Sequence, residues 1–469
     1  MKKAPSLLMR FVFYPLTTLL FLVVSLFVVV SAFGYEVSLK DGKFFSERTG
    51  IIIISSTPGE AEVYLNEDIQ KKKTPALSLF NLKLNRLKGG DYNIKVAKEG
   101  YIPWIGSLSV TPGLVTWLDY IILVPLEKEA APLNFAGKVE KAVVSDDKKA
   151  VMVSTLSDDK SIQTIWRIDV QTKTKNKIYE ADVKKSGKRE VLSLSHGNSR
   201  YLFKETVDKD QKFKVAEVKE NGLSWDISGQ FAINVSSLNF SPYSHDELFL
   251  LSGDGLYKIN FIKKAMSASI ASGVKGVYSN MHEIGFIRDY NNNIGLWRIT
   301  RSNEIENVIK ALPDSKSYNI KFSKEKNYYA VLVVDEKDLI IYSNGEKNPK
   351  LETIAKSVSD FEASPSGENI AFLNTKGFFV YNLKNEGLYK ITNKNIKKMS
   401  WLKDSSNLIY QIDKEVRMVN FDGQYNTPLF EALDDNLLLA SPTNNNIYFT
   451  SRAKDDDSDI YIYGFKVLK

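Results

Sequence analysis

Residues able to carry out catalysis or bind metals are few in this sequence of 469 residues. It contains no cysteine, which excludes thiol catalysis, cysteine-bound zinc, iron–sulfur clusters and disulfide bonds. The three histidines are His196, His245 and His282. A shared metal ion would need their imidazole nitrogens at about 2.0–2.1 Å. Each histidine falls in a turn of a different repeat unit, described below, and such turns are expected to lie too far apart. We therefore interpret all three as exposed turn residues.

Three other patterns with possible chemistry lack essential parts. Asp455-Asp456-Asp457-Ser458-Asp459 offers oxygen ligands for Ca²⁺, but it has neither the glycine nor the distant glutamate of an EF-hand loop, so we predict a solvated hairpin tip. Ser252-Gly253-Asp254-Gly255 lacks the later glycine and tryptophan of sialidase-type turns, so we predict a tight turn. The Gly-x-Ser-x-Gly motif of a hydrolase nucleophile does not occur. We expect no catalytic, cofactor-binding or metal-binding residue, no cofactor and no enzyme activity.

The composition is that of a folded protein with a nearly balanced charge. Hydrophobic residues make up 43% of the chain and aromatic residues 12%, which is enough to build cores. The 63 basic and 56 acidic residues leave a net charge of +7, and both signs are mixed along the chain. This pattern argues against a nucleic-acid partner.

The N-terminal region is predicted to anchor the protein in a membrane. Residues 11–33 form an uncharged apolar run that would reach roughly 35 Å as a helix, enough to cross a bilayer core. Lys2, Lys3 and Arg10 precede it, so residues 1–10 are expected in the cytoplasm and the bulk of the chain outside the cell membrane. The alternative is a cleaved signal peptide ending at Val30-Ser31-Ala32, but the run is longer than a signal core. We favour a single-pass signal-anchor.

After a spacer predicted at residues 34–49, residues 50–125 carry the signals of a small antiparallel β-domain. Short alternating segments are separated by turn residues. The segment resembles the PEGA domain, an all-β module of bacterial and archaeal surface proteins, and the resemblance implies no catalytic residue. The tetrapeptide that names the family reads Pro58-Gly59-Glu60-Ala61, with its middle residues exchanged. The resemblance rests on the Ser-Thr-Pro turn at 56–58, Ala61-Glu62-Val63-Tyr64-Leu65-Asn66, Thr74-Pro75, Gly90-Asp91-Tyr92 and Gly100-Tyr101.

Three lysines and two tryptophans of this domain allow a functional interpretation. Lys71-Lys72-Lys73 could contact an anionic polymer or lipid headgroups, and Trp104 and Trp117 could lie at a membrane interface. The simpler interpretation, which we prefer, is a solvated hairpin tip for the lysines and a sandwich core for the tryptophans.

Beyond a linker predicted at 126–132, residues 133–469 repeat a unit of about 42 residues. Each unit has an apolar strand that ends near a serine, then a polar turn and further strands. The position equivalent to Ser364 recurs at 145, 195, 241, 279, 323, 364, 402 and 441, and it holds a serine in every unit except at Leu402. A four-stranded unit of this length is typical of a β-propeller blade. We predict eight blades, with seven as the alternative.

The ends of the repeat array predict how the ring closes. The last unit stops after its third strand, and a spare strand precedes the first unit. We therefore expect the segment around Leu133 to Phe135 to complete the final blade. The Ser-Pro-x-Gly turns, clearest at Ser364-Pro365-Ser366-Gly367, resemble those of Tol-type periplasmic propellers and of prolyl-oligopeptidase-like enzymes. That resemblance implies a fold and not a function.

Together these features predict a membrane-anchored, extracytoplasmic cell-envelope protein. Its propeller would act as a non-catalytic binding or scaffolding platform for an envelope protein or polysaccharide. One alternative is a cell-wall or glycan hydrolase or lyase that uses carboxylates in the propeller channel, which would require paired carboxylates at about 5–9.5 Å. Another is a structural spacer of a surface layer.

Overall fold

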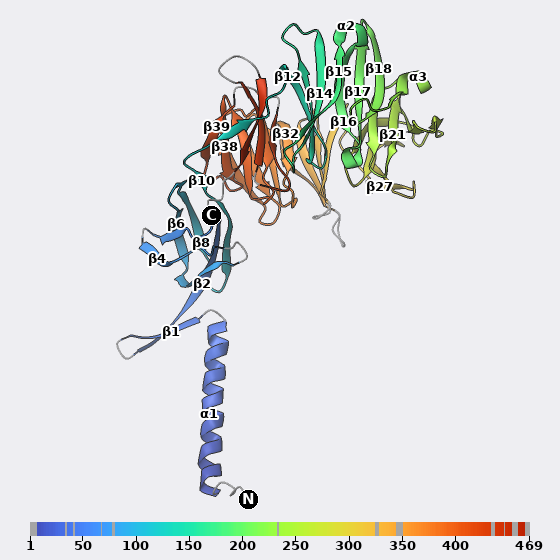
Figure 1. The fold of residues 1–469 in the computed structure, drawn as a ribbon. Coiled ribbons are helices and arrows are strands. Elements are labelled where there is room, and N and C mark those ends of the chain that lie inside the picture. Colours follow the sequence, from blue (N-terminus) through green and yellow to red (C-terminus); the bar gives the residue numbers. More distant parts are fainter. Residues whose placement is uncertain are drawn as a thin grey trace, which may run out of the picture. The chain divides into compact units, whose positions relative to one another are not determined.

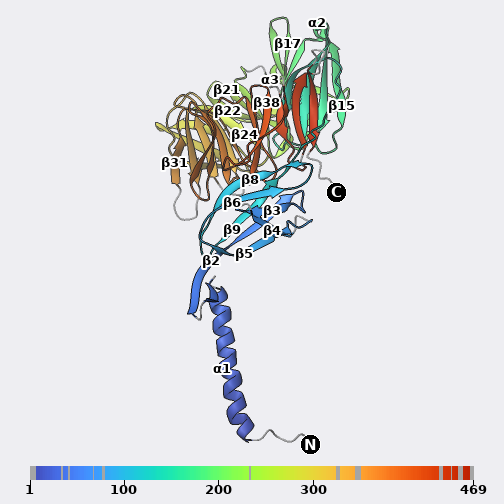
Figure 2. The same cartoon turned by 90° about the vertical axis from the view of Figure 1, so that its left-hand side faces the viewer.

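The computed structural model describes residues 7–32, 35–40, 43–66, 68–76, 80–231, 234–323, 328–343, 350–432, 437–444, 446–452 and 458–464. Most of them lie in β-strands (Figures 1 and 2), which confirms the predicted all-β class. The chain divides into two compact units, residues 1–127 with 466–469 and residues 128–465.

The first unit begins with one long helix, α1 (Leu7–Ala32). Many of its large apolar side chains are exposed, among them Leu20 and Phe21 at 63% and 69%. Within the described part of the chain, no helix combines the length and apolarity needed to span a membrane. The segment predicted to be transmembrane is thus a helix, and its insertion into a membrane stays a prediction.

Two four-stranded sheets follow the helix, together with a short strand pair. Alternate residues of β3 and β6, such as Val63 and Leu65 or Ile94 and Val96, are buried, as expected for strands with one face on a core. The first sheet contains β1 (Tyr35–Lys40), β2 (Lys43–Thr57), β5 (Leu82–Lys88) and β9 (Val115–Ile122), and the second β4 (Asp68–Lys73), β3 (Glu62–Leu65), β6 (Gly90–Ala97) and β8 (Trp104–Val110); β7 (Tyr101–Ile102) pairs with β10 (Val124–Pro125).

Three details of this unit differ from the sequence-based expectation. The predicted spacer forms the β1–β2 hairpin, with Tyr35 opposite Arg48. Its sequence has no clear alternation, but backbone hydrogen bonds do not require one. The three lysines at 71–73 end strand β4 rather than forming a hairpin tip. Trp104 is 1% exposed and belongs to the core as predicted, whereas Trp117 is 55% exposed, because it lies on the outer face of β9.

The second unit contains eight four-stranded sheets among its described residues. Each sheet is one blade; in seven of them the strands follow sequence order from the channel outward, and the last blade ends with β11 from the start of the unit. In chain order the blades are β12 (Lys138–Val144), β13 (Ala150–Leu156), β14 (Ile162–Asp169) and β15 (Lys175–Asp182); β16 (Lys188–Leu194), β17 (Arg200–Val207), β18 (Asp210–Glu217) and β19 (Ser224–Asp226); β20 (Ser237–Ser241), β21 (Ser244–Ser252), β22 (Gly255–Asn260) and β23 (Ala265–Met266); β24 (Val274–Ser279), β25 (Ile284–Tyr290), β26 (Asn293–Ile299) and β27 (Ile305–Ile309); β28 (Tyr318–Ser323), β29 (Tyr328–Val333), β30 (Asp338–Ser343) and β31 (Lys350–Ala355); β32 (Val358–Ala363), β33 (Asn369–Asn374), β34 (Gly377–Asn382) and β35 (Gly387–Thr392); β36 (Lys398–Trp401), β37 (Asn407–Ile412), β38 (Glu415–Asn420) and β39 (Thr427–Glu431); and β40 (Leu438–Ala440), β41 (Asn446–Arg452), β42 (Ser458–Gly464) and β11 (Ala130–Pro132).

The last blade is completed by a strand from the start of the unit, as predicted. That strand is β11, three residues earlier than expected and inside the segment predicted to be a linker. Ala131 pairs with Ile462, and the Leu133 N–H still donates to the Ile460 carbonyl at 2.9 Å. The register was not predictable because Ala130–Pro132 lacks an apolar alternation, and backbone pairing alone places it.

Apolar contacts between successive blades form the propeller core. One cluster combines Val151 and Ile168 of the first blade with Leu439 and Ile460 of the last, and the Tyr448 hydroxyl donates to the Val170 carbonyl at 2.7 Å. The eighth blade therefore packs on the first, and the ring is closed. Three short helices lie in connections, α2 (Val183–Ser186), η1 (His196–Asn198) and α3 (Ile227–Phe231).

Candidate functional site

The recurring serine is a structural residue of the turn between the first and second strands of a blade. The hydroxyl oxygens of Ser145, Ser195 and Ser364 accept hydrogen bonds from the backbone N–H five residues later, at 2.9, 3.0 and 3.1 Å. All three serines are at most 4% exposed. A buried hydroxyl used in this way holds the turn in shape, so the turns of successive blades project from one face of the ring.

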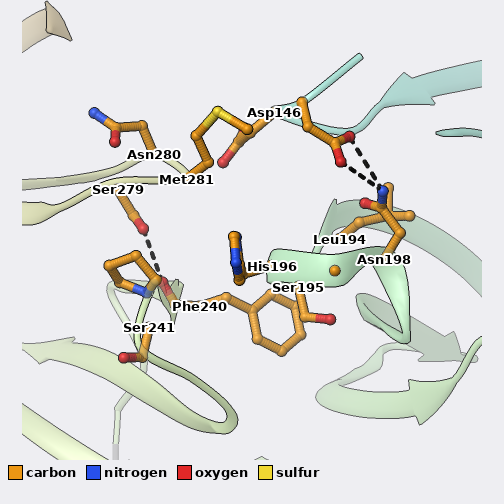
Figure 3. A pocket seen from close by; sticks show the side chains of 13 residues that line it. Asp146, Leu194, Ser195, His196, Asn198, Phe240, Ser241, Ser279, Asn280 and Met281 are labelled. Atoms are coloured by element: carbon orange, nitrogen blue, oxygen red, sulfur yellow. Dashed lines mark hydrogen bonds between the residues drawn. The ribbon is translucent and has the colours of Figure 1, made fainter. Parts of the chain in front are cut away.

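Four of these turns surround a small hollow on that face (Figure 3). Its cavity volume is about 20 Å³, room for little more than one water molecule. Hydrogen bonds join neighbouring turns: the Asn198 amide donates to both carboxylate oxygens of Asp147 at 3.1 Å, and the Ser279 hydroxyl donates to the Phe240 carbonyl at 2.8 Å. The lining contains no lysine or arginine; it consists of Asp146 and Asp147, residues 194–198, residues 240–242 and residues 279–281.

The two aspartates of the hollow differ in electrostatic environment. Burial acts to raise the pKa of Asp147, but the Ser145 hydroxyl, the Lys149 N–H and the Asn198 amide all donate to it and hold its pKa below the usual range. The Asp146 side chain is solvent-exposed, yet protein atoms crowd its carboxyl group, and this desolvation raises its pKa against the attraction of Lys321. Of the two carboxylates in the hollow, Asp146 is therefore the one that is protonated more easily.

Charged side chains from distant blades meet beside this hollow. The Lys148 ammonium, in the first blade's turn, pairs with the Glu362 carboxylate of the sixth blade at 2.6 Å. Lys321 of the fifth blade acts electrostatically on Asp146 and also on Asp360 of the sixth. Because β28 and β32 are the innermost strands of their blades, these groups lie at the channel. The first blade's turn therefore reaches across the channel mouth.

Of the three histidines, only His196 lines the hollow. His245 lies at the start of β21 and His282 in the turn before β25. Across the described ranges, no group of three or more histidine, aspartate or glutamate side chains is arranged to hold a metal ion. All three histidine side chains are exposed, as predicted.

The other two sequence patterns have simple outcomes. Residues 252–255 form a tight turn between β21 and β22, where the Asp254 carboxylate accepts from the Gly273 N–H at 3.2 Å. Asp455–Asp457 lie outside the described residues, as do the side chains of Ser458 and Asp459.

The channel-mouth residues Asp146, Lys148 and Glu362 were not predicted. The only signal for them is the charged run that follows the serine at 145, which looks like any solvated turn.

Part of the first unit matches a known domain family. Residues 49–123 match the sequence model of the PEGA domain. This segment is a PEGA domain. The expectation drawn from the turn motifs at 50–125 is confirmed, and the exchanged tetrapeptide does not alter it. Residues 49–123 run from the second half of β2 to β9, so they contain the whole second sheet and the first sheet without β1.

Comparison with solved structures finds distant β-propeller proteins. An oligogalacturonate lyase from Vibrio parahaemolyticus aligns over 71% of this chain and 100% of its own, with 10% identity and a TM-score of 0.37. AztD from Citrobacter koseri aligns over 72% and 93%, with 9% identity and a TM-score of 0.40. TolB from Acinetobacter baumannii aligns over 63% and 79%, with 9% identity and a TM-score of 0.30. No curated protein matches the sequence.

Proposed function

We propose that this protein is a single-pass envelope protein whose propeller binds another macromolecule through the face that carries the hollow. In this proposal α1 anchors the chain, its N-terminus lies in the cytoplasm, and the PEGA domain and propeller lie outside. The observation that carries the binding role is the hollow built by four successive turns, with charged side chains of three blades meeting beside it.

The anchoring role is supported by the character of α1. Its exposed leucine, valine and phenylalanine side chains would be costly in water at about 25 cal/mol per Å² of apolar surface. The only charged residues before residue 34 are Lys2, Lys3 and Arg10, which favours a cytoplasmic N-terminus. PEGA domains belong to surface proteins, in keeping with an extracytoplasmic location.

Fractionation tests the location. The protein should stay with membranes after a carbonate wash, because burial of an apolar helix in lipid is insensitive to ionic conditions. Protease added to intact, wall-stripped cells should degrade the propeller, whereas a tag placed before Lys2 should survive. A soluble fragment that begins near Phe33 would instead indicate a cleaved signal peptide, and a protected propeller would contradict the extracytoplasmic location.

Partner capture tests the binding role. Full-length protein in detergent should enrich a specific envelope component from membrane extract. The double variant Asp146→Asn, His196→Ala, which changes two side chains that line the hollow, should lose that component. The matched control is Asp413→Asn, a substitution in the β37–β38 turn of the seventh blade, which should retain it. Equal capture by both variants would rule out the hollow as the binding site.

A second candidate is a glycan-cleaving enzyme, favoured by one observation. Asp146 and Asp360 both have a pKa raised first by desolvation, and Lys321 is near both. Carboxyl groups with raised pKa values are the usual proton donors of glycoside cleavage. Release of reducing ends from cell-wall polymer, abolished by Asp360→Asn, would favour this candidate over non-catalytic binding.

A further inference from the structure

Three arginines of the propeller are each stacked on at least two aromatic rings. Arg189 lies 3.6 Å from the Tyr179 ring centre and 4.6 Å from that of Phe203. Arg200 lies 5.1 and 5.3 Å from the rings of Trp225 and Phe261. Such stacking aligns a guanidinium group and leaves its edge free for a carboxylate.

In the first two cases a carboxylate of the protein occupies that edge. Arg189 Nε is 3.2 Å from Glu205, and Arg200 pairs with Asp246. A partly buried arginine is stabilised when a carboxylate pairs with it while its flat face stacks on aromatic rings. At both arginines, the carboxylate that pairs with the guanidinium group therefore comes from the protein itself.

Arg288 in the fourth blade has the same stacking without the carboxylate. Its guanidinium lies 4.0 Å from the Trp297 ring centre and 4.5 Å from that of Tyr290. Among the residues that the structure describes, Arg288 Nε and Trp297 Nε1 are buried without a hydrogen-bond partner, and Arg288 makes no ion pair. Asp289 is next in sequence but belongs to the opposite face of β25, since side chains alternate along a strand.

Arg288 is half-buried, and the exposed residues beside it are rich in groups that bind sugars. Tyr290 is 53% exposed, and its ring meets that of Trp297 at 77° with centres 6.1 Å apart. The hairpin tip beside it consists of Asn291, Asn292 and Asn293, all exposed. An exposed aromatic ring offers a flat apolar surface, and the amides add hydrogen-bond donors and acceptors.

We propose that Arg288, Tyr290 and Trp297 form a binding site for an acidic saccharide. The carboxylate of a uronic acid residue pairs with the terminal nitrogens of Arg288, as Asp246 does with Nη1 of Arg200, and the sugar ring packs on the exposed face of Tyr290. A saccharide fits better than an acidic peptide because the site combines one cation with a flat ring and three amides, rather than with several cations. The site lies at the β25–β26 hairpin, away from the turns that form the hollow.

Calorimetric titration of the full-length protein in detergent tests this site. The probes are a tetrasaccharide of galacturonic acid, a neutral glucose tetrasaccharide and an acidic tetrapeptide. We expect binding of the uronate alone, and Arg288→Gln should weaken it at least about tenfold, the usual effect of losing one charge-assisted contact. Tyr290→Ala should weaken it several-fold. Arg301→Gln, which removes an exposed arginine at the other end of the same blade, should leave it unchanged.

Several results would overturn the proposal. These are no binding of the uronate, equal binding of the neutral tetrasaccharide, unchanged affinity in Arg288→Gln, or Arg288-dependent binding of the peptide. Tyr290→Ala changes only an exposed ring and keeps the test valid if Arg288→Gln fails to fold. Variants of the hollow should leave uronate binding intact, so this site and the proposed partner site can fail separately.

Discussion

The buried carboxylate of Glu283 should be among the most sensitive positions for propeller stability. It is 4% exposed and lies where the fourth blade meets the fifth. It accepts from the Tyr278 hydroxyl at 2.7 Å and the Tyr329 hydroxyl at 3.1 Å, and Arg298 Nη1 lies at 3.7 Å. Burial raises the pKa of both tyrosines, and the nearby Glu283 charge adds to that effect.

The cost of removing this carboxylate follows from the groups it leaves behind. Glu283→Ala removes the carboxylate that accepts from the Tyr278 and Tyr329 hydroxyls, a loss of about 1–3 kcal/mol for each bond. We therefore expect Glu283→Ala to lower the unfolding free energy by about 3–5 kcal/mol. This is also the usual cost of removing one partner of a buried ion pair. Glu283→Gln keeps one acceptor oxygen at the same place, so we expect it to cost at most about 2 kcal/mol.

Urea unfolding followed by far-UV circular dichroism measures both variants against the unchanged protein. The control is Glu304→Ala, an exposed glutamate of the same blade, which should change the unfolding free energy by at most about 0.5 kcal/mol. A loss below about 1 kcal/mol in Glu283→Ala would refute the reasoning. So would a Glu283→Gln variant as unstable as Glu283→Ala, because the acceptor would then not be what matters.

Three further predictions concern the closure and the turns. Deletion of Ala130–Pro132 removes the strand that completes the last blade, so limited proteolysis should cut that blade first and the melting temperature should fall. Ser364→Ala removes the acceptor of the Asn369 N–H and should cost about 1 kcal/mol in urea unfolding. Asp159 has a pKa of about 2, lowered chiefly by the Ser157 hydroxyl. Because the pKa is depressed, its stabilisation should be present above about pH 4 and lost as the pH falls through about 2, which carboxyl NMR titration can follow.

The sequence alone determined the architecture of this protein. Strand alternation and turn residues are local properties, so the PEGA segment and the propeller repeats could be recognised without coordinates. The repeated serine predicted the blade boundaries because it shapes the turn locally: in the turns at Ser145, Ser195 and Ser364 its hydroxyl accepts from the N–H five positions on. The spare strand before the first unit predicted ring closure, since an incomplete sheet must pair elsewhere.

Only the tertiary structure decided which side chains meet. Lys148 and Glu362 are 214 residues apart, and nothing in either turn indicates the other. Arg189 and Arg288 look alike in sequence, yet one has a carboxylate beside it and the other has none among the described residues. The physical reason is that strand formation depends on near neighbours, whereas charge pairing depends on how the ring closes and brings distant blades to one channel.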